Sequence, residues 1–271
     1  MLERLSDFIV RLMDAPLGWL LRLPSDAQLF ILAIGSALIL AGVRKVTSNQ
    51  DLLRRCRADQ ARQKTLLREA KARKDGDAVK RHRATLGMIA LKQFRQEGGP
   101  MLASLLPIVL LATWAFHRLE FHPPTAGEVV EFTARFPISA VGKITHIAPE
   151  AGVTAENGWL QEIIAVTDHG KAQGEATWRL SAGATPAPHL LRVRHGGRTY
   201  QHPFRAGAPA YEAPTKMHDD QLSATEVKLR PVRLFGVVPG FPALLLPGWL
   251  VAYLLIVVPS VPLMKRALKI C

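Results

Sequence analysis

The chain has 271 residues, of which 48% are hydrophobic, and it carries a formal net charge of +13. Three stretches, residues 27–43, 98–117 and 234–264, contain no Asp, Glu, Lys or Arg. Because a membrane-crossing helix needs about 20 apolar residues, this composition excludes a purely soluble protein, and it equally excludes a disordered or collagen-like chain. We therefore expect a membrane α-helical protein with three transmembrane helices.

Residues 1–24 are expected to form an amphipathic interfacial helix. Their apolar side chains recur at the spacing of one helix face, at Leu2, Leu5, Phe8, Ile9, Leu12 and Met13. A helix of this kind lies in the membrane surface with its apolar face toward the lipid. Packing of the same face on an outer domain of the protein is the alternative.

The first transmembrane helix is predicted over residues 25–47, and a basic segment follows it over residues 48–98. Between residues 44 and 98 the sequence holds 16 Lys or Arg against 6 Asp or Glu. Sparse apolar residues on both sides of a turn at residues 74–77 predict a cytoplasmic antiparallel helical hairpin, a short coiled coil. The Gly-Gly-Pro sequence at residues 98–100 is expected to end its second arm.

The second transmembrane helix is predicted over residues 99–118, and Pro107 is expected to kink it. Residues 119–235 then change character, with 12 acidic and 12 basic residues and with apolar residues at every second position in several segments. Gly196 and Gly197 separate two such segments and predict a β-hairpin. Since this alternation is typical of strands, we expect an extracytoplasmic antiparallel β-sandwich of about seven strands.

The third transmembrane helix is predicted within residues 236–264. Because this stretch is longer than one span, its first part is expected to approach the membrane surface, and residues 248–264 are expected to cross it. Trp249 and Tyr253 suit the level of the outer headgroups. Residues 265–271 are expected to form a short cytoplasmic tail.

The distribution of charge predicts which side of the membrane each segment occupies. Residues 44–98 carry a net charge of +10, whereas residues 119–235 carry none. Lys and Arg accumulate in cytoplasmic segments next to membrane helices. We therefore expect the hairpin and the C-terminus in the cytoplasm, and the N-terminus and the β domain outside, in a prokaryotic cytoplasmic (inner) membrane. Cys56 and Cys271 then face the reducing cytoplasm, so no disulfide is expected.

Motifs for catalysis or for a resident metal are absent from the sequence. There is no GxSxG, HExxH, Walker A or paired CxxC pattern. The nine histidines have no Cys or carboxylate companions at the spacing of metal ligands, and we expect them to be solvated surface residues. No enzyme activity, no cofactor and no metal site is therefore expected.

Short motifs occur in a fixed order along the helical segments. They are Asn49-Gln-Asp51, Ala72-Arg-Lys-Asp-Gly-Asp77, Gly99-Pro-Met101, Pro107 with Trp114, Gly248-Trp-Leu-Val-Ala-Tyr253 and Leu263-Met-Lys-Arg-Ala-Leu-Lys269. In these motifs and their order the chain resembles the YidC/Oxa/Get superfamily of membrane protein insertases, and within it the archaeal YidC-like proteins and the third subunit of the ER membrane protein complex. The resemblance covers about residues 25–118 and 240–270 and leaves the β domain as an insertion.

The resemblance implies a three-helix core with a hydrophilic groove that opens to the cytoplasm and sideways to the lipid. The residues expected to line it are Ser36, Arg44, Ser104 and Thr113. Ordinary helix packing is the alternative for the hydroxyl residues, and anchoring at the helix end is the alternative for Arg44. The first span lacks the deeper basic residue of the bacterial members, so it is more similar to branches with a polar but uncharged groove.

Twelve basic residues of the hairpin form the second candidate site. They are expected to meet ribosomal RNA or anionic headgroups, and near an anionic membrane each contributes about 1 kcal/mol. The alternative is a solvated helix pair that only follows the cytoplasmic bias for basic residues. The residues are Arg54, Arg55, Arg57, Arg62, Lys64, Arg68, Lys71, Arg73, Lys74, Lys80, Arg81 and Arg83.

This arrangement predicts a membrane protein insertase or insertion chaperone that passes short polar segments and releases client helices into lipid. The expected partners are membrane lipid, client membrane proteins, the ribosome or its RNA, and an outer partner of the β domain. One alternative is a non-catalytic scaffold or assembly factor whose β domain binds that outer partner. Another is a factor that tethers the ribosome or the lipid surface.

Overall fold

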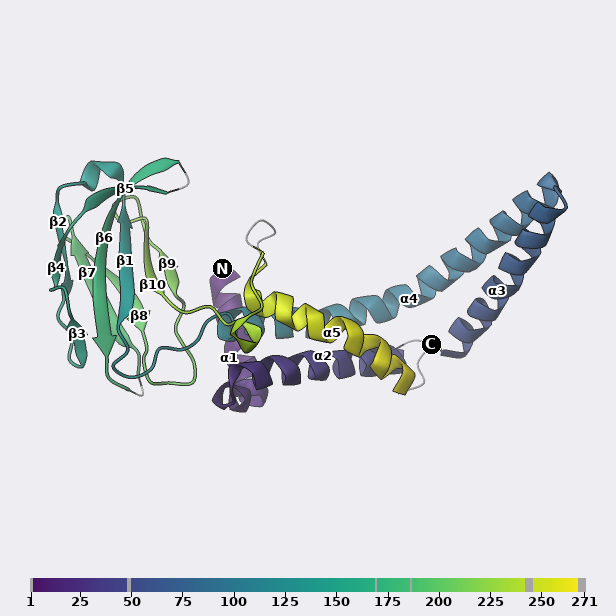
Figure 1. The fold of residues 1–271 in the computed structure, drawn as a ribbon, viewed down its shortest axis with the longest axis horizontal. Coiled ribbons are helices and arrows are strands. Elements are labelled where there is room, and N and C mark those ends of the chain that lie inside the picture. Colours follow the sequence, from purple (N-terminus) through teal and green to yellow (C-terminus); the bar gives the residue numbers. More distant parts are fainter. Residues whose placement is uncertain (1, 48–49, 169, 186, 242–245, 268–271) are drawn as a thin grey trace. The chain divides into compact units, whose positions relative to one another are not determined.

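The computed structural model describes residues 2–47, 50–168, 170–185, 187–241 and 246–267, and these divide into two compact units. A helical unit contains the residues before Ala15, Leu29–Trp114 and the residues after Trp249. The other unit contains Ala15–Gln28 and Ala115–Trp249 and consists mostly of β-strands (Figure 1). The predicted fold class is confirmed at this level, as a helical part and a separate antiparallel β domain.

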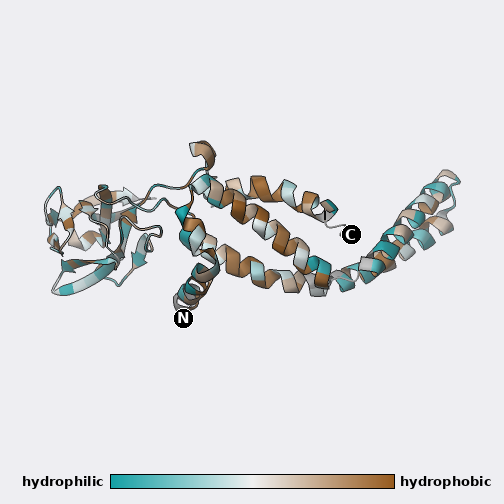
Figure 2. Ribbon diagram, turned by 90° about the horizontal axis from the view of Figure 1, so that it is seen from below, coloured by the Kyte–Doolittle hydropathy of each residue, from teal (hydrophilic) through white to brown (hydrophobic). Residues whose placement is uncertain are grey.

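The long helices, in chain order, are α1 (Leu2–Leu17), α2 (Ser25–Thr47), α3 (Gln50–Ala72), α4 (Gly76–Arg118) and α5 (Gly248–Ala267). Within the described residues, two helical stretches are long and apolar enough to cross a membrane: Ser25–Thr47, which is α2, and Met101–Arg118 in α4. The apolar stretch of α5, Gly248–Met264, is shorter. In Figure 2 hydrophobic residues dominate α2, α5 and the second half of α4, and hydrophilic residues dominate α3 and the first half of α4.

The α3–α4 hairpin is an antiparallel helix pair with a partly polar seam. Gln60 donates from Nε2 to Oε1 of Gln93 at 2.9 Å, and His82 Nδ1 lies 2.8 Å from Gln63 Oε1. The turn between the arms has a left-handed residue, Lys74, with φ of 58°. Asp75 then caps α4, since its Oδ1 accepts the N–H of Ala78 at 2.9 Å. The described chain resumes at Gln50, so Asn49 of the first motif lies outside the described residues.

Helix α4 does not end where the sequence predicts a break. It runs without interruption for 43 residues, about 65 Å, through Gly98, Gly99 and Pro100. A proline disfavours helix in the preceding residue because its ring collides with that residue's Cβ. Gly99 has no Cβ, so this part of the clash does not arise, and what remains is the hydrogen bond that Pro100 cannot donate. The hairpin arm and the apolar stretch that follows it are therefore two halves of one helix.

The β domain consists of two antiparallel sheets. The first has the order β3-β6-β1-β10-β9, with β5 also paired to β6, and the second has the order β4-β2-β7-β8. The strands of the first sheet are β1 (Val130–Phe136), β3 (Val153–Ala155), β5 (Ile164–Asp168), β6 (Lys171–Ala182), β9 (Thr215–Met217) and β10 (Ala224–Lys228). Those of the second are β2 (Ile144–Ala148), β4 (Leu160–Glu162), β7 (His189–His195) and β8 (Arg198–Phe204). The hairpin predicted at Gly196 and Gly197 is confirmed, and both glycines have positive φ.

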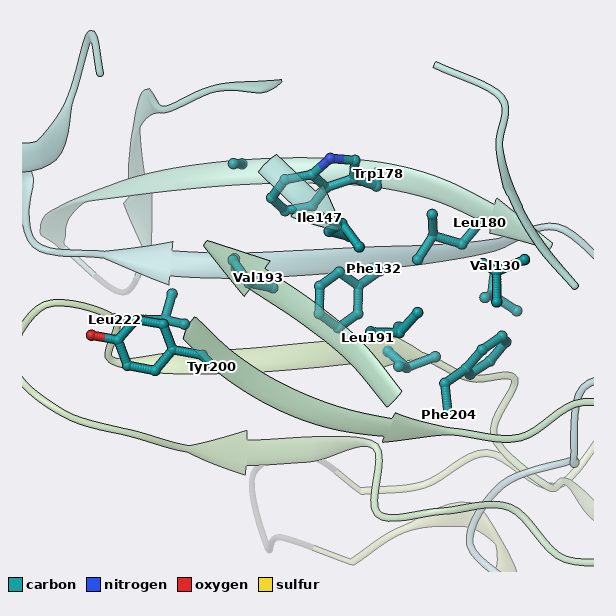
Figure 3. Packing of buried hydrophobic residues seen from close by; sticks show 14 of the residues in the cluster. Val130, Phe132, Ile147, Trp178, Leu180, Leu191, Val193, Tyr200, Phe204 and Leu222 are labelled. Atoms are coloured by element: carbon teal, nitrogen blue, oxygen red, sulfur yellow. The ribbon is translucent and has the colours of Figure 1, made fainter. Parts of the chain in front are cut away.

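The two sheets share one hydrophobic core. Phe132 and Trp178 from the first sheet and Ile147, Leu191 and Val193 from the second are fully buried in it (Figure 3). Their strands alternate buried and exposed residues, which is the pattern of a sheet with one covered face. The indole of Trp178 donates to the carbonyl of Trp159 at 3.0 Å, so its polar atom is also satisfied.

The chain enters and leaves the β domain at the same end. Phe121 and Pro231 form an isolated antiparallel bridge, and the N–H of Val232 donates to the carbonyl of Glu120 at 2.9 Å. From this rung β1 leads away, and β10 leads back toward it. The loop after Phe136 and the turn between β5 and β6 consequently lie at the opposite end of the sandwich (Figure 1).

Candidate functional site

Ser36 lies in a tightly packed seam between α2 and α5. Ala33 and Ala37 of α2 are fully buried there against Val257 of α5. The Ser36 hydroxyl, only 4% exposed, donates to the carbonyl of Ala33 at 2.9 Å and lies 2.9 Å from the hydroxyl of Tyr253. Since Ser36 has a single proton, Tyr253 is the donor in their shared bond. Small residues that let backbones approach and a polar bond across the seam are the usual means of joining membrane helices.

The other candidate groove residues lie on separate faces. Arg44 is half-buried in the last turn of α2. Ser104 and Thr113 are half-buried on α4. They are nine residues apart, about 2.5 turns of an uninterrupted helix, so they leave α4 on opposite sides. The structure thus brings Ser36 together with Tyr253, a residue that sequence analysis assigned to the headgroup level, and it separates Ser104 from Thr113.

The apolar half of α4 is the least covered part of the helical unit. Only 11% of its candidate span is buried, compared with 33% for α2. Leu102 and Leu106 are 69% and 67% exposed. Large apolar side chains are exposed on the other two helices as well, among them Phe30, Ile34, Leu38, Leu255, Val258 and Leu263. All three apolar helices therefore expose large hydrophobic side chains.

Helix α1 is attached to α4 and leaves its apolar face uncovered. Trp114 of α4 is fully buried, and its indole N–H donates to Oδ1 of Asp14 at 2.8 Å. Leu5, Phe8 and Leu12, three of the six residues of the predicted apolar stripe, are each more than half exposed, whereas Ile9 and Met13 are half-buried. The Asp14–Trp114 bond is not predictable from the sequence, because nothing in the spacing of two residues 100 positions apart indicates it.

All twelve basic candidates of the hairpin are exposed. The partly polar seam between α3 and α4 takes up the glutamines, Cys56 and Ala70, so the Lys and Arg side chains surround the hairpin on its solvent faces. Their charges act as a diffuse cationic surface rather than as a pocket.

A polar cluster joins the two sheets of the β domain. His202 of β8 is fully buried, and its Nδ1 lies 2.8 Å from the hydroxyl of Thr225 on β10. The same hydroxyl lies 2.8 Å from Nε2 of His218, and Tyr200 donates to Asp219 at 2.9 Å. The prediction of solvated surface histidines is wrong for His202 and also for His189, which is buried on β7. The burial of His202 follows from strand alternation, because Tyr200 and Phe204, two positions away on either side, also point inward.

Burial keeps the buried histidine neutral. It lowers the pKa of His202 to about 4, and the charges of Lys216 and His218 act in the same direction. The pKa of His218 is lowered too, by burial and by Lys216. Two neutral imidazoles on one hydroxyl form a structural bridge between sheets. Within the described ranges, no group of three or more His, Cys, Asp or Glu side chains is placed to hold a metal ion.

Comparison with known proteins gives no relative: no family model, no curated protein and no solved structure matches the chain.

Proposed function

We propose that this protein is a membrane protein insertase or insertion chaperone of the YidC/Oxa type, with spans at residues 25–47 and 99–118 and a third span within residues 236–264. The observation that carries the proposal is the continuity of α4. One helix joins an exposed basic hairpin to an apolar stretch that is barely covered by its neighbours. A helix of this kind offers a cationic surface at one end and an open apolar flank at the other.

The outward-facing apolar side chains support a membrane environment. Removing a side chain such as Leu102, Leu106 or Val258 from water is favourable by about 1.5–3 kcal/mol when the burial is complete. Lipid satisfies these side chains without any protein partner. The exposed stripe of Leu5, Phe8 and Leu12 on α1 supports a helix in the membrane surface in the same way.

The short third span supports a locally thinned bilayer. The apolar stretch Gly248–Met264 has 17 residues, about 25 Å of helix, whereas the hydrocarbon core is about 30 Å thick. A span that is too short draws the two lipid surfaces together. A thinner apolar layer is a shorter path for the polar segment of a client.

We place the client path along α4, beside the α2–α5 pair. That pair is held together by buried alanines and by the Ser36–Tyr253 bond, whereas the apolar half of α4 has open flanks. A charged residue at the bilayer centre costs about 2.5–3.5 kcal/mol on insertion scales. Either Ser104 or Thr113, but not both, faces a client on one flank, and Arg44 provides a cation near the hairpin side. The client's apolar helix then leaves sideways into lipid, driven by apolar burial.

The charge distribution supports the sidedness of the proposal. The hairpin, with its net positive charge, belongs in the cytoplasm, and the β domain, whose net charge is zero, belongs outside. The twelve exposed basic side chains then meet anionic headgroups or ribosomal RNA. The greater part of the proposed C-terminal tail, residues 268–271, lies outside the described residues.

Reconstitution tests the proposed function. The purified chain in liposomes is mixed with a single-span client that has a short polar segment on its translocated side, and protease protection reports insertion. We expect more protected client than in protein-free liposomes of the same lipid. Equal protection in the two preparations refutes the proposal.

Deletion of the β domain separates the insertase from a scaffold. The hydrogen bond between Glu120 and Val232 allows residues 121–231 to be replaced by a short Gly-Ser linker without moving the helix ends apart. An insertase keeps its activity in liposomes after this deletion. A scaffold whose β domain binds an outer partner loses its function while its helices stay intact.

Neutralising the hairpin separates the insertase from a tethering factor. Replacement of the twelve basic residues by Gln leaves the polar seam of Gln60, Gln63, His82 and Gln93 unchanged. If the protein is an insertase, this change weakens its insertion activity. If it is a tethering factor, the change abolishes its function.

A further inference from the structure

One strand edge of the β domain is left open at the end opposite its linkers. Residues 160–168 form a nearly continuous extended run, in which β4 pairs with β2 and β5 pairs with β6. Ile163 joins the two strands. Its N–H donates to the carbonyl of Lys143 and its carbonyl accepts the N–H of Gly142, both at 2.9 Å. The run therefore uses one edge for β2 and then the other edge for β6.

The alternation of a strand identifies the groups on the open edge. The carbonyl of Trp159 accepts the N–H of Ile147 on β2, and the backbone N–H and carbonyl of Ile163 also face the β2 side. Because backbone groups of an antiparallel strand face alternate edges, Ala165 and Thr167 direct their N–H and C=O to that same side. The chain before β2 has turned away there into a short 3-10 helix, Ile138–Ala140. Among the described strands, none but β6 pairs with β5.

Exposed apolar side chains flank this open edge. Ile163 bonds to Gly142 and Lys143, and the neighbours of these residues in the chain are Val141, Ile144 and Ile164. Ile144 and Ile164 are 66% and 57% exposed. Leu160, on the same run, is exposed as well. Soluble proteins normally protect edge strands with a covering loop, a proline or a bulge. Among the described residues of this edge, main-chain groups without a partner strand and exposed apolar side chains occur together.

We propose that the free edge of β5 binds an extended segment of another polypeptide as an added antiparallel strand. The added strand continues the line of β2, and the backbone of Ala165 and Thr167 pairs with it. Main-chain pairing tolerates many sequences, whereas the flanking Ile and Val side chains favour a segment with alternate apolar residues. The proposed function supplies the source, the translocated segment of a client, and to that extent the inference rests on it.

A proline scan with a matched control tests the edge. The full chain in lipid nanodiscs is titrated against a fluorescein-labelled peptide of alternating valine and threonine with lysine at both ends, and anisotropy gives the Kd. Ala165→Pro removes an outward N–H and leaves the β6 ladder intact. Ala172→Pro, on β6 opposite Thr167, removes an N–H that points away from β5. We expect the Kd to rise at least tenfold for A165P and to stay within twofold for A172P.

Several outcomes overturn the proposal. It fails if the wild-type chain does not bind the peptide at 1 mM, or if the two proline variants lose binding equally. Circular dichroism checks the fold, and Ile164→Lys, which keeps the backbone, gives a second variant in which weaker binding is expected. If sedimentation shows that the wild-type chain self-associates and that A165P alone abolishes this, the edge belongs to a second copy of the chain and the proposal is wrong.

Photo-crosslinking distinguishes this inference from the proposed function. A benzoylphenylalanine at position 167 is expected to crosslink the outer segment of the client during insertion into liposomes, and the same group at position 172 is not. Insertion without a crosslink from position 167 refutes the edge site and leaves the insertase. Peptide binding that A165P abolishes, in a chain that inserts no client, supports the edge site and refutes the insertase.

Discussion

Acid is expected to weaken the β domain through His202. This side chain is fully buried, bonded through Nδ1 to Thr225, and its pKa is lowered from 6.5 to about 4. In the unfolded chain it titrates near 6.5, so between pH 6.5 and pH 4 the unfolded state binds more protons than the folded state. The stability that the neutral imidazole contributes is therefore complete at pH 8 and is lost as the pH falls.

The size of this effect follows from the two pKa values. Lowering the pH from 8 to 5 removes about 2 kcal/mol of unfolding free energy through this one residue. Urea unfolding of the β domain in the detergent-solubilised chain, followed by the β-sheet circular dichroism, measures it at each pH. We expect His202→Gln to be less stable than the wild-type chain at pH 8. Between pH 8 and pH 5, however, its unfolding free energy should fall by about 2 kcal/mol less than that of the wild-type chain. His218→Gln, at a half-buried position, serves as the matched variant and retains most of the pH dependence.

The reasoning is refuted if H202Q and the wild-type chain lose the same free energy between pH 8 and pH 5. In that case the buried imidazole is not the group that takes up the proton, and the bridge to Thr225 does not hold it neutral.

Three further changes test the packing of the two units. Tyr253→Phe removes the bond to Ser36 and should lower stability by about 0.5–1.5 kcal/mol, seen as a lower Tm in detergent. Trp114→Phe withdraws a donor from Asp14 and should cost about 1–3 kcal/mol, measured by faster hydrogen exchange in α1. Gly207→Ala should destabilise the β domain by about 2–4 kcal/mol in urea, since φ is +71° and the new Cβ would lie 2.6 Å from that of Ala184.

Matched substitutions make these outcomes specific. Gly127→Ala has a similar positive φ but open space around its Cβ, so it should cost less than Gly207→Ala. Equal losses at the two glycines contradict the steric argument. A Tyr253→Phe variant as stable as the wild-type chain shows that the Ser36 hydroxyl needs only the carbonyl of Ala33.

Much of the β domain was predictable because its longer strands alternate clearly. Phe132 and Trp178, which sit opposite each other in the β1–β6 ladder, follow a period of two. The predicted seven strands are fewer than the ten in the described residues, because β3, β4 and β9 have three residues each and carry almost no periodic signal. The hairpin at Gly196 and Gly197 was predictable because positive φ favours glycine.

The candidate groove shows where sequence reasoning reaches its limit. Polar residues in apolar helices are easy to find, but their faces depend on where each helix is continuous. Because a break was predicted at residues 98–100, the full length of α4 was not. Ser104 and Thr113 were chosen by residue type, although nine residues of helix place them on opposite faces. Tyr253, the partner of Ser36, is 217 positions away in the chain, and only the folded structure pairs them.

The uninterrupted course of α4 has a mechanical consequence. Backbone hydrogen bonds between successive turns stiffen an α-helix, and in α4 they continue on both sides of Pro100 and Pro107, which have no N–H to donate. A binding partner that displaces the tip near Lys80 sideways would tilt the helix, and the apolar half would then move in the opposite direction. Because the helix continues through residues 98–100, we expect part of a tilt imposed at the tip to reach the flank around Leu102 and Leu106.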